Sequence, residues 1–218
     1  VDNLAQLRAL EPTVRRYWPG LLVSWTRLLG GRFTDAKVGH DLLIGILIGV
    51  GSCQVTLMLP LLSPEFQRVH GKQLFLDIPL TIGGILHAAH STVGSIVFGA
   101  FVLVVMRLIL RHQTTAALGA FLLFGTIHSL ISGVPLHLWP IIWLQVGLFL
   151  FALLRFGLLC SIVALFVFII GQNAITIDPS RFYFANAMVH IGVIIFLAAI
   201  GCISALGVWQ KLWKTQRF

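Results

Sequence analysis

Long apolar stretches with almost no charged residues dominate this chain of 218 residues and constrain its fold more than any other feature. They cover Leu42–Leu62, Leu80–Leu110, Thr115–Gly133, Trp139–Gly171 and Phe182–Val208. A helix needs about 20 apolar residues to cross the hydrocarbon core of a bilayer, and these stretches are long enough. Charged residues make up only 10% of the chain, against about 25% in an ordinary soluble domain. The sequence therefore predicts an all-α polytopic membrane bundle and excludes a soluble globular enzyme.

Two of these stretches are too long for one upright helix. Trp139–Gly171 carries Arg155 at its centre, where a charge in lipid costs about 2.5–3.5 kcal/mol. A hairpin that turns at 154–157 would place Arg155 in water, so we expect six transmembrane helices. Leu80–Leu110 leaves two alternatives open. It is either one strongly tilted helix, or a re-entrant piece interrupted at Gly83 and Gly84 and followed by a span from about His90.

The distribution of positive charge predicts the orientation. With six spans, twelve of the fifteen Lys and Arg residues lie on one side, which the positive-inside rule makes cytoplasmic. Both termini are then cytoplasmic, and the net charge of +8 reflects topology rather than binding to nucleic acid. Residues 1–40 are mixed in polarity and contain PGLLVSWTRLL at Pro19–Leu29, which suits an amphipathic helix in the headgroup plane. We therefore divide the chain into an interfacial segment, 1–40, and a transmembrane bundle, 41–218.

Small residues at helical spacing predict where helices pack closely. Gly45 and Gly49 form a GxxxG pattern on the first span, and Ser91, Ser95 and Gly99 continue such a stripe on the second. The partner of each stripe, within the chain or outside it, stays open. The three cysteines all lie in apolar runs and are expected to be buried, inert thiols.

No catalytic motif is found in the sequence, so we do not expect an enzyme. Histidines in the apolar runs are the candidate binding residues. With six spans, His128 and His190 lie in the outer half of the bilayer, and His90 reaches a similar depth if its helix is continuous. Neutral imidazoles at that depth could bind the metal of a haem or a chlorophyll. The alternative is that they form hydrogen bonds between neighbouring helices. We predict no site for a free metal ion.

Three stretches resemble a group of bacterial proteins. They are EPTVRRYWPGLLVSWTRLLGGRFTDAKVGHDLLIG at Glu11–Gly45, LRFGLLCSIVALFV at Leu154–Val167 and RFYFANA at Arg181–Ala187. Together they resemble the C-terminal membrane region of bacterial serine/threonine protein kinase-like proteins, in which a cytoplasmic kinase domain precedes a polytopic membrane module. The resemblance is strongest before the first span and implies a membrane module without kinase activity of its own.

The chain departs from that group at several positions. Ala36 stands where the group tends to have proline, His40 stands where it tends to have arginine, and the loop 173–180 differs. The kinase domain has no counterpart in this sequence, so none of its catalytic residues can be carried over.

These observations lead to one functional expectation and two alternatives. We expect a non-catalytic membrane module that acts as a structural or accessory subunit of a larger assembly. Its partners would be membrane lipids and larger integral membrane subunits, in the plasma (inner) membrane of a bacterium. One alternative is the membrane anchor or sensor region of a kinase-like receptor, because the chain begins at Val1 and could be a piece of a longer product. The other is a subunit of a photosynthetic or respiratory complex that binds chlorophyll or haem through His90, His128 or His190.

Overall fold

The computed structural model of the chain describes residues 23–31, 35–57, 59–62, 78–172 and 184–206, and every element in these ranges is a helix. The long helices are α3 (Ala36–Leu57), α5 (Ile78–Leu110), α6 (Gln113–Ser132), α7 (Trp139–Arg155) and α9 (Phe184–Ala205). The shorter ones are α2 (Val23–Leu29), α4 (Leu59–Leu62), the 3₁₀ turn η1 (Leu136–Leu138) and α8 (Leu158–Gly171).

Five of the helical segments are long and apolar enough to cross a membrane. They cover 36–56, 80–110, 113–132, 136–155 and 184–205. This confirms the predicted class, an all-helical multi-pass membrane bundle. The sixth predicted span is α8, whose 14 residues extend about 21 Å and are fewer than a helix needs to cross alone. The number of crossings and the side on which the termini lie stay predictions.

The hairpin predicted at Arg155 is confirmed. α7 ends at Arg155, which is exposed, and α8 begins at Leu158. Gly157 between them has a φ of 100° and a ψ of −172°, a conformation that is open almost only to glycine. The glycine therefore allows the chain to reverse direction within two residues, which keeps the Arg155 charge out of the apolar interior.

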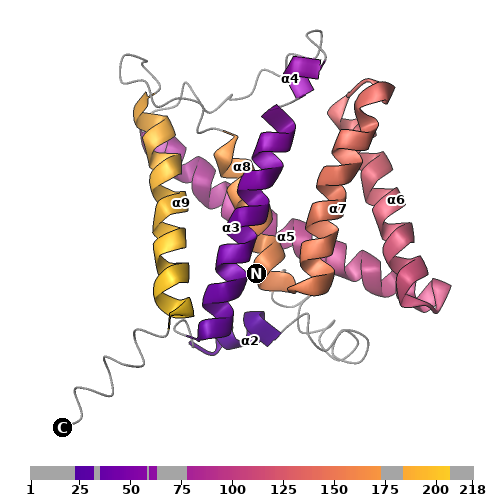
Figure 1. Cartoon of the computed structure of the whole chain (residues 1–218), viewed down its shortest axis with the longest axis horizontal. Coiled ribbons are helices and arrows are strands. Elements are labelled where there is room, and N and C mark those ends of the chain that lie inside the picture. Colours follow the sequence, from indigo (N-terminus) through magenta and orange to yellow (C-terminus); the bar gives the residue numbers. More distant parts are fainter. Residues whose placement is uncertain (1–22, 32–34, 58, 63–77, 173–183, 207–218) are drawn as a thin grey trace.

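The 80–110 stretch is one continuous helix. α5 runs unbroken through Gly83 and Gly84 for 33 residues, about 50 Å. Figure 1 shows it passing diagonally behind the other helices, from the upper end of α9 to the lower end of α6. Of the two alternatives for this stretch, the structure has the continuous, strongly tilted helix.

α3 and α8 form the centre of the bundle, with α9 and α6 at opposite edges (Figure 1). Gly45 and Gly49 of α3 face α8 so closely that added Cβ atoms would lie 2.6 Å from the carbonyl oxygens of Cys160 and Ala164, respectively. The predicted GxxxG stripe therefore packs within the chain. α3 also packs against α9, where Gly39 lies even closer to the backbone of Ala205.

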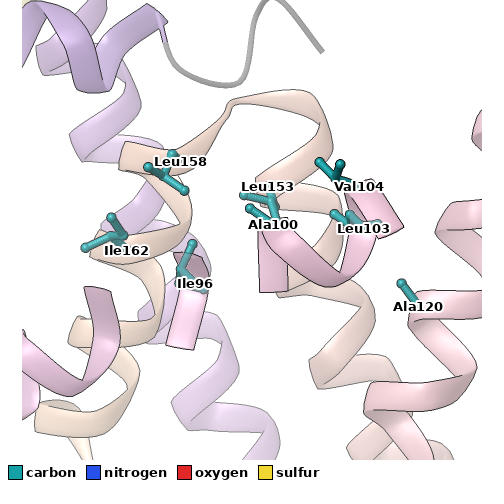
Figure 2. Close-up of a cluster of buried hydrophobic side chains, with 8 residues drawn as sticks. All are labelled: Ile96, Ala100, Leu103, Val104, Ala120, Leu153, Leu158 and Ile162. Atoms are coloured by element: carbon teal, nitrogen blue, oxygen red, sulfur yellow. The ribbon is translucent and has the colours of Figure 1, made fainter. Parts of the chain in front are cut away.

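A second centre of packing lies where α5, α6, α7 and α8 meet. Leu103 and Ala120 are fully buried there, and Leu153 and Leu158 join them from the two arms of the hairpin. Figure 2 shows this cluster, which comprises Ile96, Ala100, Leu103, Val104, Ala120, Leu153, Leu158 and Ile162. Close packing of these apolar side chains holds the tilted α5 against the α7–α8 hairpin.

The first span begins earlier than predicted. α3 starts at Ala36 rather than at Leu42, and Asp35 caps it by accepting a hydrogen bond from the Lys37 backbone N–H at 2.9 Å. The predicted interfacial segment 1–40 therefore includes the first turn of the bundle. Its only other described part is 23–31, where α2 packs against α3 and α8. The rest of that segment, Phe182 and Tyr183, and positions 207–208 of the last predicted span lie outside the described residues.

The cysteines divide into two groups. Cys53 and Cys160 are buried as expected, whereas Cys202 is exposed near the end of α9. The expectation of three buried thiols is wrong at Cys202, because an apolar helix at the edge of a bundle turns one face outward to the membrane.

Candidate functional site

A cavity of about 450 Å³ lies between α5, α6, α7 and α8. A smaller hollow of about 140 Å³ adjoins it. The two spaces share the lining residues Ser95, Phe124, Val146, Phe149 and Leu165. We refer to both together as the α5–α8 cavity. Pockets for small molecules are typically about 300–1,000 Å³, so this cavity is large enough to hold one.

The small residues of α5 produce this cavity. Ser95 and Gly99 line it, and a Cβ atom added at Gly99 would have no neighbour within 4 Å. α5 and α6 meet at the turn formed by Arg111 and His112, and Figure 1 shows them diverging from there. The spacing of these small residues predicts a close helix contact. Because α5 and α6 diverge, the residues border open space instead.

Three polar side chains line the cavity among apolar ones: Ser95 from α5, His128 from α6 and Gln145 from α7. Gln145 is only 3% exposed and donates a hydrogen bond from Nε2 to the Thr56 hydroxyl at 3.4 Å. Thr56 in turn donates to the Ser52 carbonyl at 3.2 Å. A carboxamide has two N–H donors and an oxygen that accepts, so Gln145 keeps hydrogen-bonding capacity for a bound molecule.

The polarity of the lining changes along the cavity. His128 and Gln145 line only the larger part. The residues that line only the smaller part are Ile96, Gly99, Leu150 and Leu153, all apolar. Of the residues that the structure describes, no Lys, Arg, Asp or Glu lines either part. The cavity is therefore an uncharged, elongated space with hydrogen-bonding groups toward one end.

The three histidines predicted to bind a tetrapyrrole lie in different surroundings. His128 is exposed and lines the cavity, and His90 is exposed on α5. His190 is 1% exposed, and its Nδ1 lies 2.7 Å from the carbonyl oxygen of Asn186 in the same helix. Its Nε2 is buried without a hydrogen-bond partner. α6 and α9 lie at opposite edges of the bundle (Figure 1), so the structure does not bring His128 and His190 into one site.

The described histidines also form no metal-binding cluster with other side chains. In the part of the chain that the structure describes, no group of three His, Cys, Asp or Glu side chains could hold a metal ion. The tetrapyrrole hypothesis therefore rests on single histidines, of which His128 alone lines the cavity described above.

Polar contacts that the sequence does not indicate hold α2 against the bundle. The Ser24 hydroxyl donates a hydrogen bond to Oδ2 of Asp41, and both residues are buried. Arg27 also forms two hydrogen bonds with the carboxylate of Asp35, at 2.8 and 3.0 Å. Between them in the sequence, Trp25 packs against the cluster of Figure 2 and against a second cluster of buried apolar residues. That second cluster joins α3 to α8 and comprises Val38, Leu42, Ile46, Leu159, Val163 and Val167. We call this set of contacts the α2 contact; it ties the segment that precedes the first span to the centre of the fold.

Comparison of the chain with protein-family models, with curated proteins and with solved structures gives no match. The resemblance to kinase-like membrane regions therefore stays a hypothesis that rests on the quoted stretches of sequence.

Proposed function

We propose that this chain is a non-catalytic membrane module that serves as a structural or accessory subunit of a larger membrane assembly. The observation that carries the proposal is the outer face of α9. In this edge helix, as in α6, only 22% of the most apolar stretch is buried in the bundle, and α9 adds an open glycine beside large exposed apolar side chains. The remainder is available to lipid or to another protein.

The outer face of α9 combines a small residue with large apolar ones, as helix-packing surfaces in membranes do. Ile195 and Phe196 are 63% and 65% exposed, and Ile203 is 40% exposed. Gly192 lies one turn before Ile195 and Phe196, and a Cβ atom added there would meet nothing within 4 Å. Small residues beside large apolar ones allow a second helix to approach closely, and such contacts drive helix association in membranes. These residues support a protein neighbour on this face.

Cys202 offers a direct test because it is an exposed thiol on the same helix. A crosslinker with a maleimide and a photoreactive diazirine is attached to Cys202 in native membranes and then irradiated. We expect a discrete adduct with a larger integral membrane protein, which is absent in Cys202→Ser. Gly192→Leu should reduce the adduct at least threefold, whereas Gly83→Leu, at an equally open glycine on α5, should not. Crosslinks to lipid alone would contradict the proposal.

A second candidate is the membrane anchor or sensor region of a bacterial kinase-like receptor. The α2 contact favours it, because Ser24, Trp25 and Arg27 join α2 to the core of the bundle. A kinase domain that preceded α2 in the chain would therefore be coupled to that core. The resemblance at Glu11–Gly45 covers the same segment. An antibody raised against 113–138 tests this candidate on fractionated bacterial plasma membranes. A band far above 24.0 kDa that also carries kinase sequence would support it, and a band at 24.0 kDa would exclude it.

The third candidate is a tetrapyrrole-binding subunit of a photosynthetic or respiratory complex. The position of His128 in the α5–α8 cavity favours it, because an imidazole there could bind haem iron or chlorophyll magnesium. The absorption spectrum of the purified protein tests it. A tetrapyrrole band that is lost in His128→Ala but kept in His90→Ala and His190→Ala would support this candidate.

A further inference from the structure

We propose that the α5–α8 cavity binds a neutral single-chain lipid, of the monoacylglycerol type, with its headgroup beside Gln145 and His128 and its chain toward Leu153. The proposal goes beyond the accessory role, since a subunit with a partner on α9 needs no ligand between α5 and α8. It rests on the shape of the cavity, on the charge and polarity of its lining, and on its exposed rim.

The shape fits one extended chain. Gln145 lines the polar part of the cavity and Leu153 lines the apolar part, and the two lie eight residues apart on α7. That separation is about 12 Å along the helix axis. Val146 and Phe149 line both parts, so the space is continuous between these ends. A space of this length suits one segment of a hydrocarbon chain, and the rest of a longer chain would extend past the exposed rim into the bilayer.

The lining selects an uncharged headgroup. Gln145 is buried and donates one hydrogen bond to Thr56, so the carboxamide can still donate to a hydroxyl or to an ester carbonyl, and can accept from a hydroxyl. Among the described residues that line the two parts, none is a Lys or Arg that could neutralise a carboxylate or a phosphate. A charged group buried without a counter-charge carries a large desolvation penalty. Fatty acids and phospholipids should therefore bind more weakly than a glycerol ester.

The rim of the cavity on α5 and α6 is exposed, and these two helices diverge from the turn that joins them (Figure 1). Its lining residues on these two helices include Phe98, which is 60% exposed, and Ile127 and Ile131, which are 43% and 80% exposed. These apolar rim residues would contact acyl chains of the bilayer. A lipid could thus enter sideways from the hydrocarbon region without crossing water.

Photolabelling of the full chain in phosphatidylcholine vesicles tests the proposal. The probe is a monoolein analogue that carries a diazirine in its acyl chain, and labelled peptides are located by mass spectrometry. We expect saturable labelling of α7 and α8, with monoolein competing at least tenfold better than oleate. Gly99→Phe should reduce labelling at least fivefold, because the ring fills open space in the cavity. The matched control is Gly83→Phe, at another open glycine of α5 outside the cavity lining, and it should label like the unchanged protein.

A second variant separates recognition of the headgroup from recognition of the chain. Gln145→Leu should weaken competition by monoolein about three- to tenfold, the usual effect of a lost hydrogen bond, and leave competition by hexadecane unchanged. Gel filtration and thermal unfolding identify variants that fail to fold, and Ser95→Leu then replaces Gly99→Phe as the filling variant. The proposal is overturned if labelling persists in folded filling variants, or if oleate competes as well as monoolein. It is also overturned if the purified protein holds a tetrapyrrole that depends on His128.

Discussion

The Ser24 hydroxyl donates a hydrogen bond to the carboxylate of Asp41, and this buried contact joins α2 to the first long helix. The other carboxylate oxygen of Asp41 lies 3.6 Å from Nδ1 of His40, whose side chain is exposed. A carboxylate inside an apolar bundle needs a hydrogen-bond donor, since an isolated one is strongly disfavoured. Ser24 supplies that donor, whereas 3.6 Å is too long for a hydrogen bond from His40. The Ser24–Asp41 pair therefore fixes how the segment before the first span meets the membrane domain.

Removal of the Asp41 carboxylate should destabilise the fold. Asp41→Ala leaves the buried Ser24 hydroxyl without its acceptor, which typically costs about 1–3 kcal/mol. Asp41→Asn keeps an acceptor oxygen and should lose less. Denaturant unfolding in detergent, followed by circular dichroism, measures both changes. His40→Ala, at the exposed neighbour, is the control and should stay within about 0.5 kcal/mol of the unchanged protein. Equal stability of Asp41→Ala and His40→Ala would contradict this role of Asp41.

The glycine stripe on α3 predicts a sharp difference between neighbouring positions. Gly45→Ala places a methyl group 2.6 Å from the Cys160 carbonyl oxygen, so α3 and α8 must separate, at a cost of about 1–3 kcal/mol. Gly51→Ala lies on the same helix in open space and should gain up to about 1 kcal/mol from helix propensity. Thermal unfolding of the two variants in the same detergent gives the comparison. A stabilised Gly45→Ala would show that α3 and α8 do not pack as described.

The α7–α8 hairpin depends on one backbone conformation. Gly157 has φ 100° and ψ −172°, so Gly157→Asn should destabilise the protein by about 1–3 kcal/mol. Gly133, which ends α6, has φ 62° and ψ 23°, in the left-handed region that asparagine tolerates. Gly133→Asn should therefore be nearly neutral. If unfolding measurements rank the two variants in the opposite order, the hairpin does not turn as the structure shows.

The membrane topology can be tested with single cysteines. In a protein lacking Cys53, Cys160 and Cys202, an impermeant thiol reagent is applied to oriented vesicles. Arg155→Cys and His112→Cys lie at exposed turns and should react from the same, cytoplasmic side. Leu136→Cys, in the exposed turn between α6 and α7, should react only from the other side. Reaction of Arg155→Cys from the side of Leu136→Cys would rule out the predicted orientation.

Features that follow from local sequence were predictable. Arg155 inside a long apolar stretch has no favourable place in lipid, so a turn was required there, and Gly157 supplies it. The spacing of Gly45 and Gly49 likewise indicated close helix packing. It did not identify α8 as the partner, because spacing describes one helix face and not the helix that meets it.

Features that depend on tertiary arrangement were not predictable. Ser95 and Gly99 have the spacing of a packing stripe, yet they line a cavity because α5 and α6 diverge. The buried contact of Asp41 has no local signal, since its partner Ser24 lies 17 residues away. Gln145 does carry a signal in the sequence, because a carboxamide within an apolar run needs a polar partner.

Native mass spectrometry of the particle that contains this chain, gently solubilised from its own membrane, tests the central claim most directly. The proposed accessory role predicts this chain in fixed stoichiometry with larger integral membrane subunits, with mass added when the monoacylglycerol-type lipid is retained. A lone monomer of this chain under conditions that preserve other membrane complexes would contradict that role.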